Sequence, residues 1–313
     1  MNHSTIALSF LAFGFSLLGA LGTAGAEPAR PLHILVLGAH PDDCELKASG
    51  VALKWVQQGH HVKFVSVTNG DIGHWKIKGE ELAKRRLAEV QAADKLLGVE
   101  TEVLPIHDGE LEPTLENRRA ITRLIRRWNA DIVIGHRPCD YHPDHRYVGI
   151  LMQDAAYMVT VPFFCPDTPP LKKNPVFLYL SDEFQKPTAF KADVIVAIDD
   201  VFEKKIDVFH ALESQTYEGG ANGSEADLKQ VPPASDVAAR KAWMRRAWWA
   251  QDSSLVAHRH RADLIKWYGP EIGKAVRNAE AFEICEYGSV PTAAELAQLF
   301  PFFGKGAAEK EKR

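Results

Sequence analysis

The chain has 313 residues, of which 46% are hydrophobic and 25% are charged. This composition is typical of a folded globular protein with a large core, and it excludes a chain that is disordered throughout. The formal net charge of −4 gives no basic surplus for binding a phosphate backbone, so we expect no nucleic-acid partner.

The first 26 residues differ sharply from the rest of the chain. They contain no Asp, Glu, Lys or Arg, and residues 6–21 form a nearly continuous run of apolar and small side chains. Ala24-Gly25-Ala26 is a small-x-small site of the kind that signal peptidase cuts. We therefore expect residues 1–26 to be a signal peptide and the protein to be exported, with no stable membrane span after cleavage. A retained membrane anchor is the alternative, because the run reaches spanning length only if its glycines are counted.

No two of the four cysteines form a CxxC pair, which argues against both a zinc ribbon and a thioredoxin-type site. In an oxidising compartment three pairings are possible, and the sequence does not choose among them. Small buried thiols are the alternative. The four residues are Cys44, Cys139, Cys165 and Cys285.

Strands and helices are predicted to alternate through the first half of the mature chain. The predicted strands are 33–39, 62–67, 101–106 and 131–134. The predicted helices are 46–58, 80–97, 115–128 and 145–158. Such alternation implies right-handed crossovers and a parallel sheet with helices on both faces. The predicted fold is therefore α/β, a Rossmann-like three-layer α/β/α arrangement with a mostly parallel sheet.

The second half is less regular. Strands are predicted at 176–180 and 193–198, a helix at 201–215, and a long loop at 216–236 that borders the active site. Trp243, Trp248 and Trp249 follow among basic residues, and we expect them to pack in the core or at a subunit contact, because aromatic residues dominate burial. We expect residues 27–300 to form one domain and residues 301–313 a flexible tail.

Parallel sheets bind ligands at the carboxyl ends of their strands, so the segments after residues 39, 67, 106 and 134 are expected to converge. A dinucleotide site is excluded because the first turn is Gly38-Ala39-His40-Pro41-Asp42-Asp43 and not GxGxxG, which would place two carboxylates where a pyrophosphate sits.

Two segments after predicted strands are rich in metal-binding side chains. They are His40-Pro-Asp42-Asp43-Cys-Glu45 and Asp140-Tyr-His142-Pro-Asp144-His145-Arg146. Hydrolytic zinc sites use three protein ligands of the His and carboxylate type and leave a fourth position for water. The two segments together therefore predict a metal centre.

The pattern AHPDDCE followed by DYHPDHR resembles the PIG-L/LmbE-like family, relatives of N-acetylglucosaminyl-phosphatidylinositol de-N-acetylase that include bacterial mycothiol-pathway deacetylases. Weaker features extend the resemblance over residues 31–285. They include Thr68-Asn-Gly70-Asp71, Arg86-x-x-Glu89, Asp108-Gly109, Ser214-Gln215 and Ala279-Glu280-Ala281-Phe282.

Position by position, the resemblance implies a role for each motif residue. His40, Asp43 and His145 match the metal ligands, and Asp42 matches the general base. The chemistry is consistent with this, since zinc activates water and polarises a carbonyl but a nearby carboxylate must still take the proton.

The second motif is expected to stabilise the reaction's negative charge. His142 matches the residue that stabilises the tetrahedral oxyanion as an imidazolium, and Asp144 matches the partner that keeps its proton affinity high. Arg86 and Asp108 match substrate-facing positions, with a helix salt bridge and a turn cap as the respective alternatives. Glu45 is expected to interact with the positive end of the first helix and not with the metal.

These roles imply a metal-dependent hydrolase that removes an N-acetyl group, with zinc as the expected ion and iron(II) or cobalt as alternatives. The expected partner is a small N-acylated sugar or glycoconjugate, and an oligomer is left open. One departure weakens the aminosugar assignment, because Leu212 stands where many relatives carry a His before the Ser-Gln pair. An amidase acting on another secondary amide is the first alternative, and a non-catalytic exported sugar- or metal-binding module is the second.

Overall fold

The computed structural model describes residues 30–303. The expected signal peptide at 1–26 and the tail from residue 304 onward lie outside the described residues. The strands are β1 (His33–Gly38), β2 (His61–Ser66), β3 (Glu100–Val103), β4 (Ile132–Gly135), β5 (Val176–Leu180), β6 (Val194–Ala197) and β7 (Ala279–Cys285).

The helices separate and follow these strands. Those of the first half are α1 (Asp43–Gln57), α2 (Gly79–Leu97), α3 (Leu115–Trp128) and α4 (Pro143–Met158). Those of the second half are α5 (Phe202–Ala211), α6 (Glu213–Thr216), the 3-10 helix η1 (Gly220–Asn222), α7 (Glu225–Leu228), α8 (Val237–Met244), α9 (Trp248–Arg259), α10 (Arg261–Ala275) and α11 (Ala293–Leu299). Among residues 30–303, no helix has both the length and the apolar character that crossing a bilayer requires.

The strands form one sheet in the order β3-β2-β1-β4-β5-β7-β6. Strands β3, β2, β1, β4 and β5 are mutually parallel, with Ile34 of β1 opposite Val62 on one side and Ile132 on the other. Strand β7 runs antiparallel to both β5 and β6. The predicted α/β class with a mostly parallel sheet is therefore confirmed.

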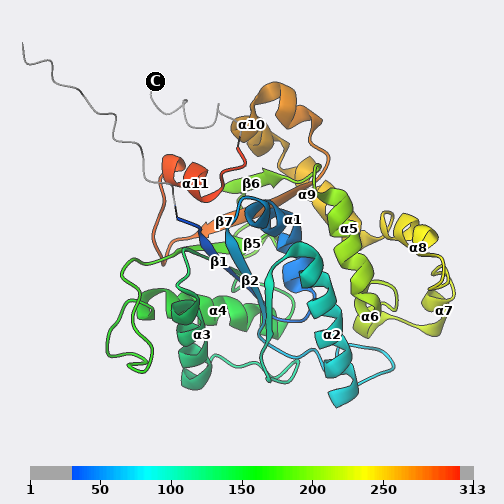
Figure 1. The fold of residues 1–313 in the computed structure, drawn as a ribbon, viewed down its shortest axis with the longest axis horizontal. Coiled ribbons are helices and arrows are strands. Elements are labelled where there is room, and N and C mark those ends of the chain that lie inside the picture. Colours follow the sequence, from blue (N-terminus) through cyan, green and yellow to red (C-terminus); the bar gives the residue numbers. More distant parts are fainter. Residues whose placement is uncertain (1–29, 304–313) are drawn as a thin grey trace, which may run out of the picture. The chain divides into compact units, whose positions relative to one another are not determined.

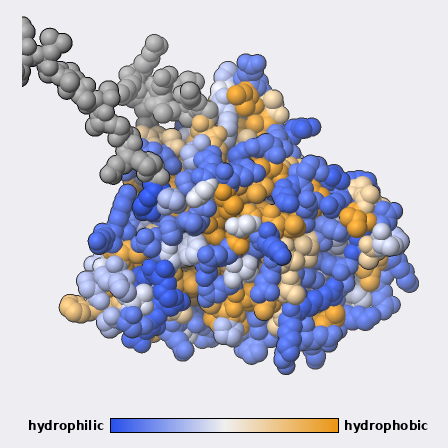
Figure 2. Space-filling model, viewed as in Figure 1, coloured by the Kyte–Doolittle hydropathy of each residue, from blue (hydrophilic) through white to orange (hydrophobic). Residues whose placement is uncertain are grey.

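Both faces of the sheet are covered by helices. Ile34 and Val36 of β1 are buried in a core cluster with residues of α1 and α2, whereas Leu35 and Leu37 point into a second cluster with α3 and α4. Figure 1 shows α1, α2 and α5 on one side of the sheet and α3 and α4 on the other. On the face drawn in Figure 2, polar residues predominate around the rim and apolar residues come to the surface along the middle.

Two helices begin earlier than expected, and both differences affect the site. Helix α1 begins at Asp43 and not at residue 46, and α4 begins at Pro143 and not at residue 145. Their first turns are polar, so apolar periodicity does not mark them. Proline is favoured at the first position of a helix because its missing N–H has no intrahelical partner there. The consequence is that Asp43, Asp144 and His145 are all held on first helical turns.

Other bounds also differ from expectation. The third strand ends at Val103 and not at residue 106, because Pro105 has no N–H to donate to a neighbouring strand. The helix expected at 201–215 is broken at Leu212, whose φ of −90° and ψ of 55° are not helical. The loop expected at 216–236 contains η1 and α7. Residues 279–285, which form β7, were not predicted to be a strand.

All four cysteines are free thiols in this structure. Cys44, Cys165 and Cys285 are buried, and Cys139 is partly exposed. The sequence left disulfide bonds and free thiols as alternatives, and in the structure the four cysteines are unpaired.

Arg126 on α3 holds together the segment that follows α4. Its guanidinium donates hydrogen bonds of 2.6–3.1 Å to six backbone carbonyls, those of Met158, Val159, Val161, Phe164, Cys165 and Thr168. We expect Arg126→Met to lower the free energy of unfolding by about 3–5 kcal/mol, because buried carbonyls would lose their donors. The neighbouring exposed Arg127→Met is the matched control and is expected to cost less than about 0.5 kcal/mol. Equal urea midpoints for the two variants would contradict this assignment.

Candidate metal centre and active-site cavity

The polar residues that follow β1, β2, β3 and β4 meet at one edge of the sheet. Residues 40–43 follow β1, residue 71 follows β2, residue 108 follows β3 and residues 136–145 follow β4. The turn from β1 into α1 is tight, since a Cβ added to Gly38 would lie 2.8 Å from the Cβ of Asp43. Glycine at this position therefore allows α1 to begin directly beside the strand that precedes it.

Three atoms from the two motif segments form a compact cage. His40 Nδ1 lies 3.2 Å from His145 Nε2, and Asp43 Oδ2 lies 3.5 Å from each of these nitrogens. Ligand atoms around a tetrahedral zinc ion at bond lengths of about 2.1 Å lie about 3.4 Å apart. All three side chains are almost fully buried. The spacing and the donor set therefore fit a zinc-sized divalent cation.

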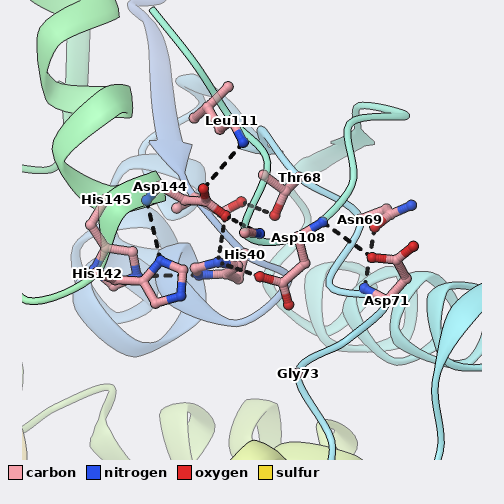
Figure 3. A network of polar contacts seen from close by, with 12 residues as sticks. His40, Thr68, Asn69, Asp71, Gly73, Asp108, Leu111, His142, Asp144 and His145 are labelled. Atoms are coloured by element: carbon pink, nitrogen blue, oxygen red, sulfur yellow. Dashed lines mark hydrogen bonds and ion pairs between the residues drawn. The ribbon is translucent and has the colours of Figure 1, made fainter.

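The outer nitrogens of both imidazoles face carboxylates. His40 Nε2 lies 3.0 Å from Asp108 Oδ1 and 3.2 Å from Asp144 Oδ2, and His145 Nδ1 lies 3.1 Å from Asp140 Oδ1. Metal-binding histidines usually donate their second N–H to such a partner, which fixes the tautomer and the ring orientation. In Figure 3 the His40 side chain lies between the imidazoles of His142 and His145 and the carboxylate of Asp108.

The charges around the cage favour a cation. Burial opposes protonation of His40, but its contacts with Asp108, Asp144 and Asp43 outweigh burial and raise the pKa of His40 well above its ordinary value. Burial likewise opposes ionisation of Asp43, yet the nearby imidazoles of His145 and His136 hold the pKa of Asp43 well below its usual range. Positive charge at this point is therefore stabilised, and a divalent ion supplies it.

Three further groups of side chains within the described residues also have metal-ligand spacing and overlap the cage. One contains His40, Asp108, His142 and Asp144 and another contains Asp43, His136 and His145, while His40, His142 and His145 form a third combination. The groups share residues, so they describe one polar cluster. In the His40, Asp43 and His145 cage, one nitrogen of each imidazole faces the centre and the second nitrogen lies beside a carboxylate.

His136 belongs to the same cluster, although it lies outside both motif segments. Its ring stacks on His145 with centroids 4.0 Å apart, and its Nε2 lies 3.2 Å from Asp43 Oδ2. Burial and the charge of His145 lower the pKa of His136. The sequence signal was its place directly after β4, but a single histidine there does not reveal a contact with a residue that follows β1.

Asp42 lies beside the cage without belonging to it. Its φ of 147° lies in a region that residues with a side chain rarely adopt, a strain that typically costs about 1–3 kcal/mol. One carboxylate oxygen accepts a short hydrogen bond from Gln215 Nε2. Burial, together with the charge of Asp43, raises the pKa of Asp42 to about 7. The strained backbone thus presents a buried carboxyl group that changes its protonation near neutral pH.

His142 and Asp144 are arranged differently from the expectation. The carboxylate of Asp144 faces His40 and accepts from the backbone N–H groups of Gly109 and Leu111, at 2.7 and 3.3 Å. His142 Nδ1 accepts from the Asp144 backbone N–H at 3.2 Å, so this nitrogen carries no proton. Burial and the charges of His40 and His145 lower the pKa of His142. This geometry leaves Nε2 of His142 as the nitrogen that can donate a hydrogen bond.

Arg86 and Asp108, expected to face substrate, lie together at the cavity. Arg86 Nη1 is 3.9 Å from Asp108 Oδ2, and Arg86 Nη2 donates to the carbonyl of Gly73 at 2.5 Å. Both side chains line the same cavity as the cage. Arg86 and Asp108 therefore pair with each other and also lie at the cavity wall.

Glu45 lies in the first turn of α1 but is buried against Asp94 of α2. The expected interaction with the helix end is therefore incomplete, because its main partner is a second carboxyl group. Burial and the proximity of Asp94 raise the pKa of Glu45, and burial raises the pKa of Asp94 to about 7. Burial therefore disfavours the ionised form of both carboxyl groups, and the charge of Asp94 disfavours that of Glu45 further.

This pair predicts a pH dependence of stability. A carboxyl group whose pKa is raised on folding destabilises the folded state increasingly as pH rises. The loss of stability begins near the pKa of the unfolded state, about 4, and is complete above the pKa of the folded state. We therefore expect Asp94→Asn to gain stability relative to the unmodified protein by on the order of 1–3 kcal/mol between pH 4 and pH 7, and to gain no more above pH 7. Urea unfolding at five pH values checks this, and parallel curves for the two proteins would contradict it.

The cage opens into a cavity of about 840 Å³. The motif residues and Arg86 line it, and so do residues from α6 to the start of α9, including Gln215, Tyr217 and Trp248. Volumes of about 300–1,000 Å³ are typical of small-molecule sites. This one therefore has room for more than a single sugar ring.

The rim of the cavity is held by contacts between two loops. His74 Nε2 lies 2.9 Å from Glu218 Oε2, and Trp75 donates from its backbone N–H to Gly220 O and from Nε1 to Glu218 O. Arg85 of α2 adds two hydrogen bonds to the Glu218 carboxylate, at 2.7 and 2.8 Å. These contacts fix the 218–223 loop against α2.

The chain is similar to known deacetylases in sequence. Residues 35–156 match the family described as PIG-L, GlcNAc-PI de-N-acetylase. A relative, diacetylchitobiose deacetylase from Thermococcus kodakarensis, is 31% identical over 192 residues, which cover 58% of this chain and 69% of that protein.

Two solved structures share the fold. N,N'-diacetylchitobiose deacetylase from Pyrococcus horikoshii, complexed with its inhibitor MPG, matches with a TM-score of 0.59 and 25% identity, over 81% of this chain and 84% of that one. GalB, the 4-carboxy-2-hydroxymuconate hydratase from Pseudomonas putida KT2440, matches with a TM-score of 0.61 and 18% identity, over 83% and 98%. The second likeness shows the fold alone, so the reaction has to be argued from the site residues.

Proposed function

The chain belongs to the PIG-L family, and on that premise we propose that it is a metal-dependent hydrolase that removes the N-acetyl group from a glucosamine-like sugar or glycoconjugate. The observation that carries the proposal is the cage of His40, Asp43 and His145, which has metal-ligand spacing and lies beside the unligated carboxyl group of Asp42. Sugar deacetylation is the activity named for the relatives from Thermococcus and Pyrococcus.

His40 Nδ1, Asp43 Oδ2 and His145 Nε2 would hold the metal. Zinc is proposed because imidazole and carboxylate ligands at this spacing suit it, and iron(II) and cobalt are the alternatives. When bound, such an ion lowers the pKa of water and polarises the acyl carbonyl. Asp108, Asp140 and Asp144 would then orient the two imidazoles from their outer nitrogens.

Asp42 is proposed as the general base. Its carboxylate takes a proton from the attacking water while the water oxygen bonds to the acyl carbon. The carbon–nitrogen bond then breaks, and the same carboxyl group returns the proton to the leaving amine, so acetate and a free amine are released. Gln215 holds one oxygen of Asp42 by a hydrogen bond, which orients the carboxyl group for this transfer.

His142 is proposed to stabilise the oxyanion through its Nε2–H. Removal of one such donor typically costs about 3–4 kcal/mol of barrier. A neutral imidazole suits this role because its Nδ1 is already occupied by the Asp144 backbone N–H. Asp144 would act on His40 and on the loop after β3, and its charge raises the pKa of His142 against the opposing effects of burial, His40 and His145. Arg86 and Asp108 would contact the hydroxyl groups of the sugar.

An amidase acting on another secondary amide remains the alternative, and Leu212 is the residue that favours it. Relatives with a His at that position have a polar group that this chain lacks, and Leu212 is buried. A non-catalytic sugar- or metal-binding module is less well supported, because such a module has no use for the strained, buried carboxyl group of Asp42.

Acetate release tests the proposal. The purified protein is loaded with zinc, its bound metal is measured, and it is given N-acetylglucosamine, N,N'-diacetylchitobiose and a simple N-acetylated amine. We expect acetate from at least one of the sugars. Metal-loaded protein that releases acetate only from the simple amine would favour the amidase, and metal-loaded protein that releases none would refute the hydrolase.

We also propose that the N-terminal segment directs export of the protein. Its uncharged apolar run and its small-x-small site support the proposal. Cell fractionation checks it, and the result expected is an exported form whose first residue is Glu27.

A further inference from the structure

The part of the cavity wall that is formed by residues from α6 to the start of α9 is rich in aromatic rings. Trp249 is buried, and its ring contacts Phe209 with centroids 5.8 Å apart. The ring of Trp243 lies 5.7 Å from that of Tyr217. Both tryptophans line the cavity and are anchored on core residues at the same time. For Trp249 the expectation of core packing is therefore met.

Trp248 differs from its neighbours. It is the first residue of α9, lines the cavity and is 62% exposed, while its ring rests on Trp249 with centroids 4.7 Å apart. Core packing does not account for a tryptophan that leaves this much apolar surface open, and exposed apolar surface inside a cleft is typical of a ligand-binding wall. The three tryptophans were expected to pack in the core or at a subunit contact, and core packing alone does not account for Trp248.

We propose that Trp248 is a stacking platform for a second pyranose ring, so that the substrate is an N-acetylated disaccharide or longer glycan and not a monosaccharide. This inference rests on the proposed deacetylase function and deepens it. A pyranose ring has an apolar C–H face, which can pack on the indole while the first sugar presents its acetamido group to the cage.

The polar residues of the same wall favour a sugar over an apolar chain. Asn222 and Asp227 are exposed, line the cavity and belong to the segment between α6 and α8. A sugar needs hydrogen-bonding partners for its hydroxyl rim beside the aromatic surface, whereas an alkyl chain would desolvate these groups without replacing their hydrogen bonds. The contacts of Glu218 with Arg85 and His74 hold the loop that carries Asn222, so this part of the wall is ordered before the ligand binds.

Steady-state kinetics on sugars of two lengths test the platform. We expect Trp248→Ala to raise KM for N,N'-diacetylchitobiose about five- to tenfold, while KM for N-acetylglucosamine and kcat for both sugars change less than about twofold. Trp248→Tyr keeps an aromatic face and is expected to recover most of the lost affinity. Tyr157→Ala is the matched control, because Tyr157 is 71% exposed on α4 and does not line the cavity.

A binding measurement separates this inference from the proposed function. Disaccharide binding is followed by tryptophan fluorescence in an Asp42→Asn background, with and without the Trp248→Ala change, so that no turnover is needed. A five- to tenfold loss of disaccharide affinity supports the platform even if no sugar is deacetylated, and unchanged affinity overturns it. If both sugars are deacetylated but Trp248→Ala alters their KM values equally, the platform is overturned and the deacetylase stands. A loss confined to substrates with a long alkyl chain also overturns it, in favour of an apolar ligand.

Discussion

Replacement of Asp42 by Asn is expected to lower kcat for deacetylation by about 10²–10⁴-fold while the bound metal is retained. The amide has nearly the shape of the carboxyl group but cannot accept the proton of the attacking water. Because Asp42 does not belong to the cage, its replacement leaves the three ligand atoms in place. The measurement is kcat together with the metal content of the same samples.

The pH profile adds a second readout at this position. A general base works only when ionised, so the rate of the unmodified enzyme rises with pH through the pKa of Asp42. That pKa is about 7 in the structure described, and a bound cation shifts the rise to lower pH, because positive charge favours the carboxylate. The residual activity of Asp42→Asn is expected to lack this rise. An unchanged rate, or a rate lost only together with the metal, would contradict the role of base.

Replacement by glycine shows whether the loss of rate comes from unfolding. Glycine adopts the φ of 147° readily, and it removes a buried carboxyl group whose ionised form burial disfavours. Asp42→Gly is therefore expected to be inactive and yet more stable than the unmodified protein, by about 1–3 kcal/mol. A less stable glycine variant would show that the backbone at this position is not strained.

Replacement of His145 by Ala is expected to abolish both metal retention and deacetylation, because one of three protein ligands is lost. His136→Ala is the matched control, since His136 is also buried and stacks on His145. As a neighbour of the ligands, it is expected to lower metal affinity by no more than about 10–100-fold. Metal titration of both variants makes the comparison. Loss of the metal in His136→Ala with its retention in His145→Ala would assign the ligands differently.

The sequence predicted the features of the fold and site that local patterns determine. Apolar runs and helical periodicity located the parallel strands and the helices that cover them, and the end of each strand indicated where polar residues would gather. The starts of α1 and α4 were placed too late because their first turns consist of proline, carboxylates and histidine. Because both motifs follow parallel strands, the sequence also predicted that His40 and His145 lie at the same edge of the sheet. In the structure they are in contact there.

Features that depend on long-range packing could not be predicted. The bond from Gln215 to Asp42 joins residues 173 positions apart, and the contact of His136 with Asp43 joins the ends of two neighbouring strands, β4 and β1. The open face of Trp248 depends on how α8 and α9 pack against α5. The antiparallel strand β7 depends on partners in β5 and β6, so its own pattern did not reveal it. Sequence patterns indicate which residue types are present, whereas only the packing shows which atoms meet.

Anomalous diffraction at the zinc edge from crystals of the metal-loaded protein tests the central claim most directly. The account predicts one strong peak within coordination distance of His40 Nδ1, Asp43 Oδ2 and His145 Nε2, with Asp42 beside it and unbound. A peak bound by Asp108, His142 and Asp144, or no peak in crystals of protein that retains all three proposed ligands, would contradict it.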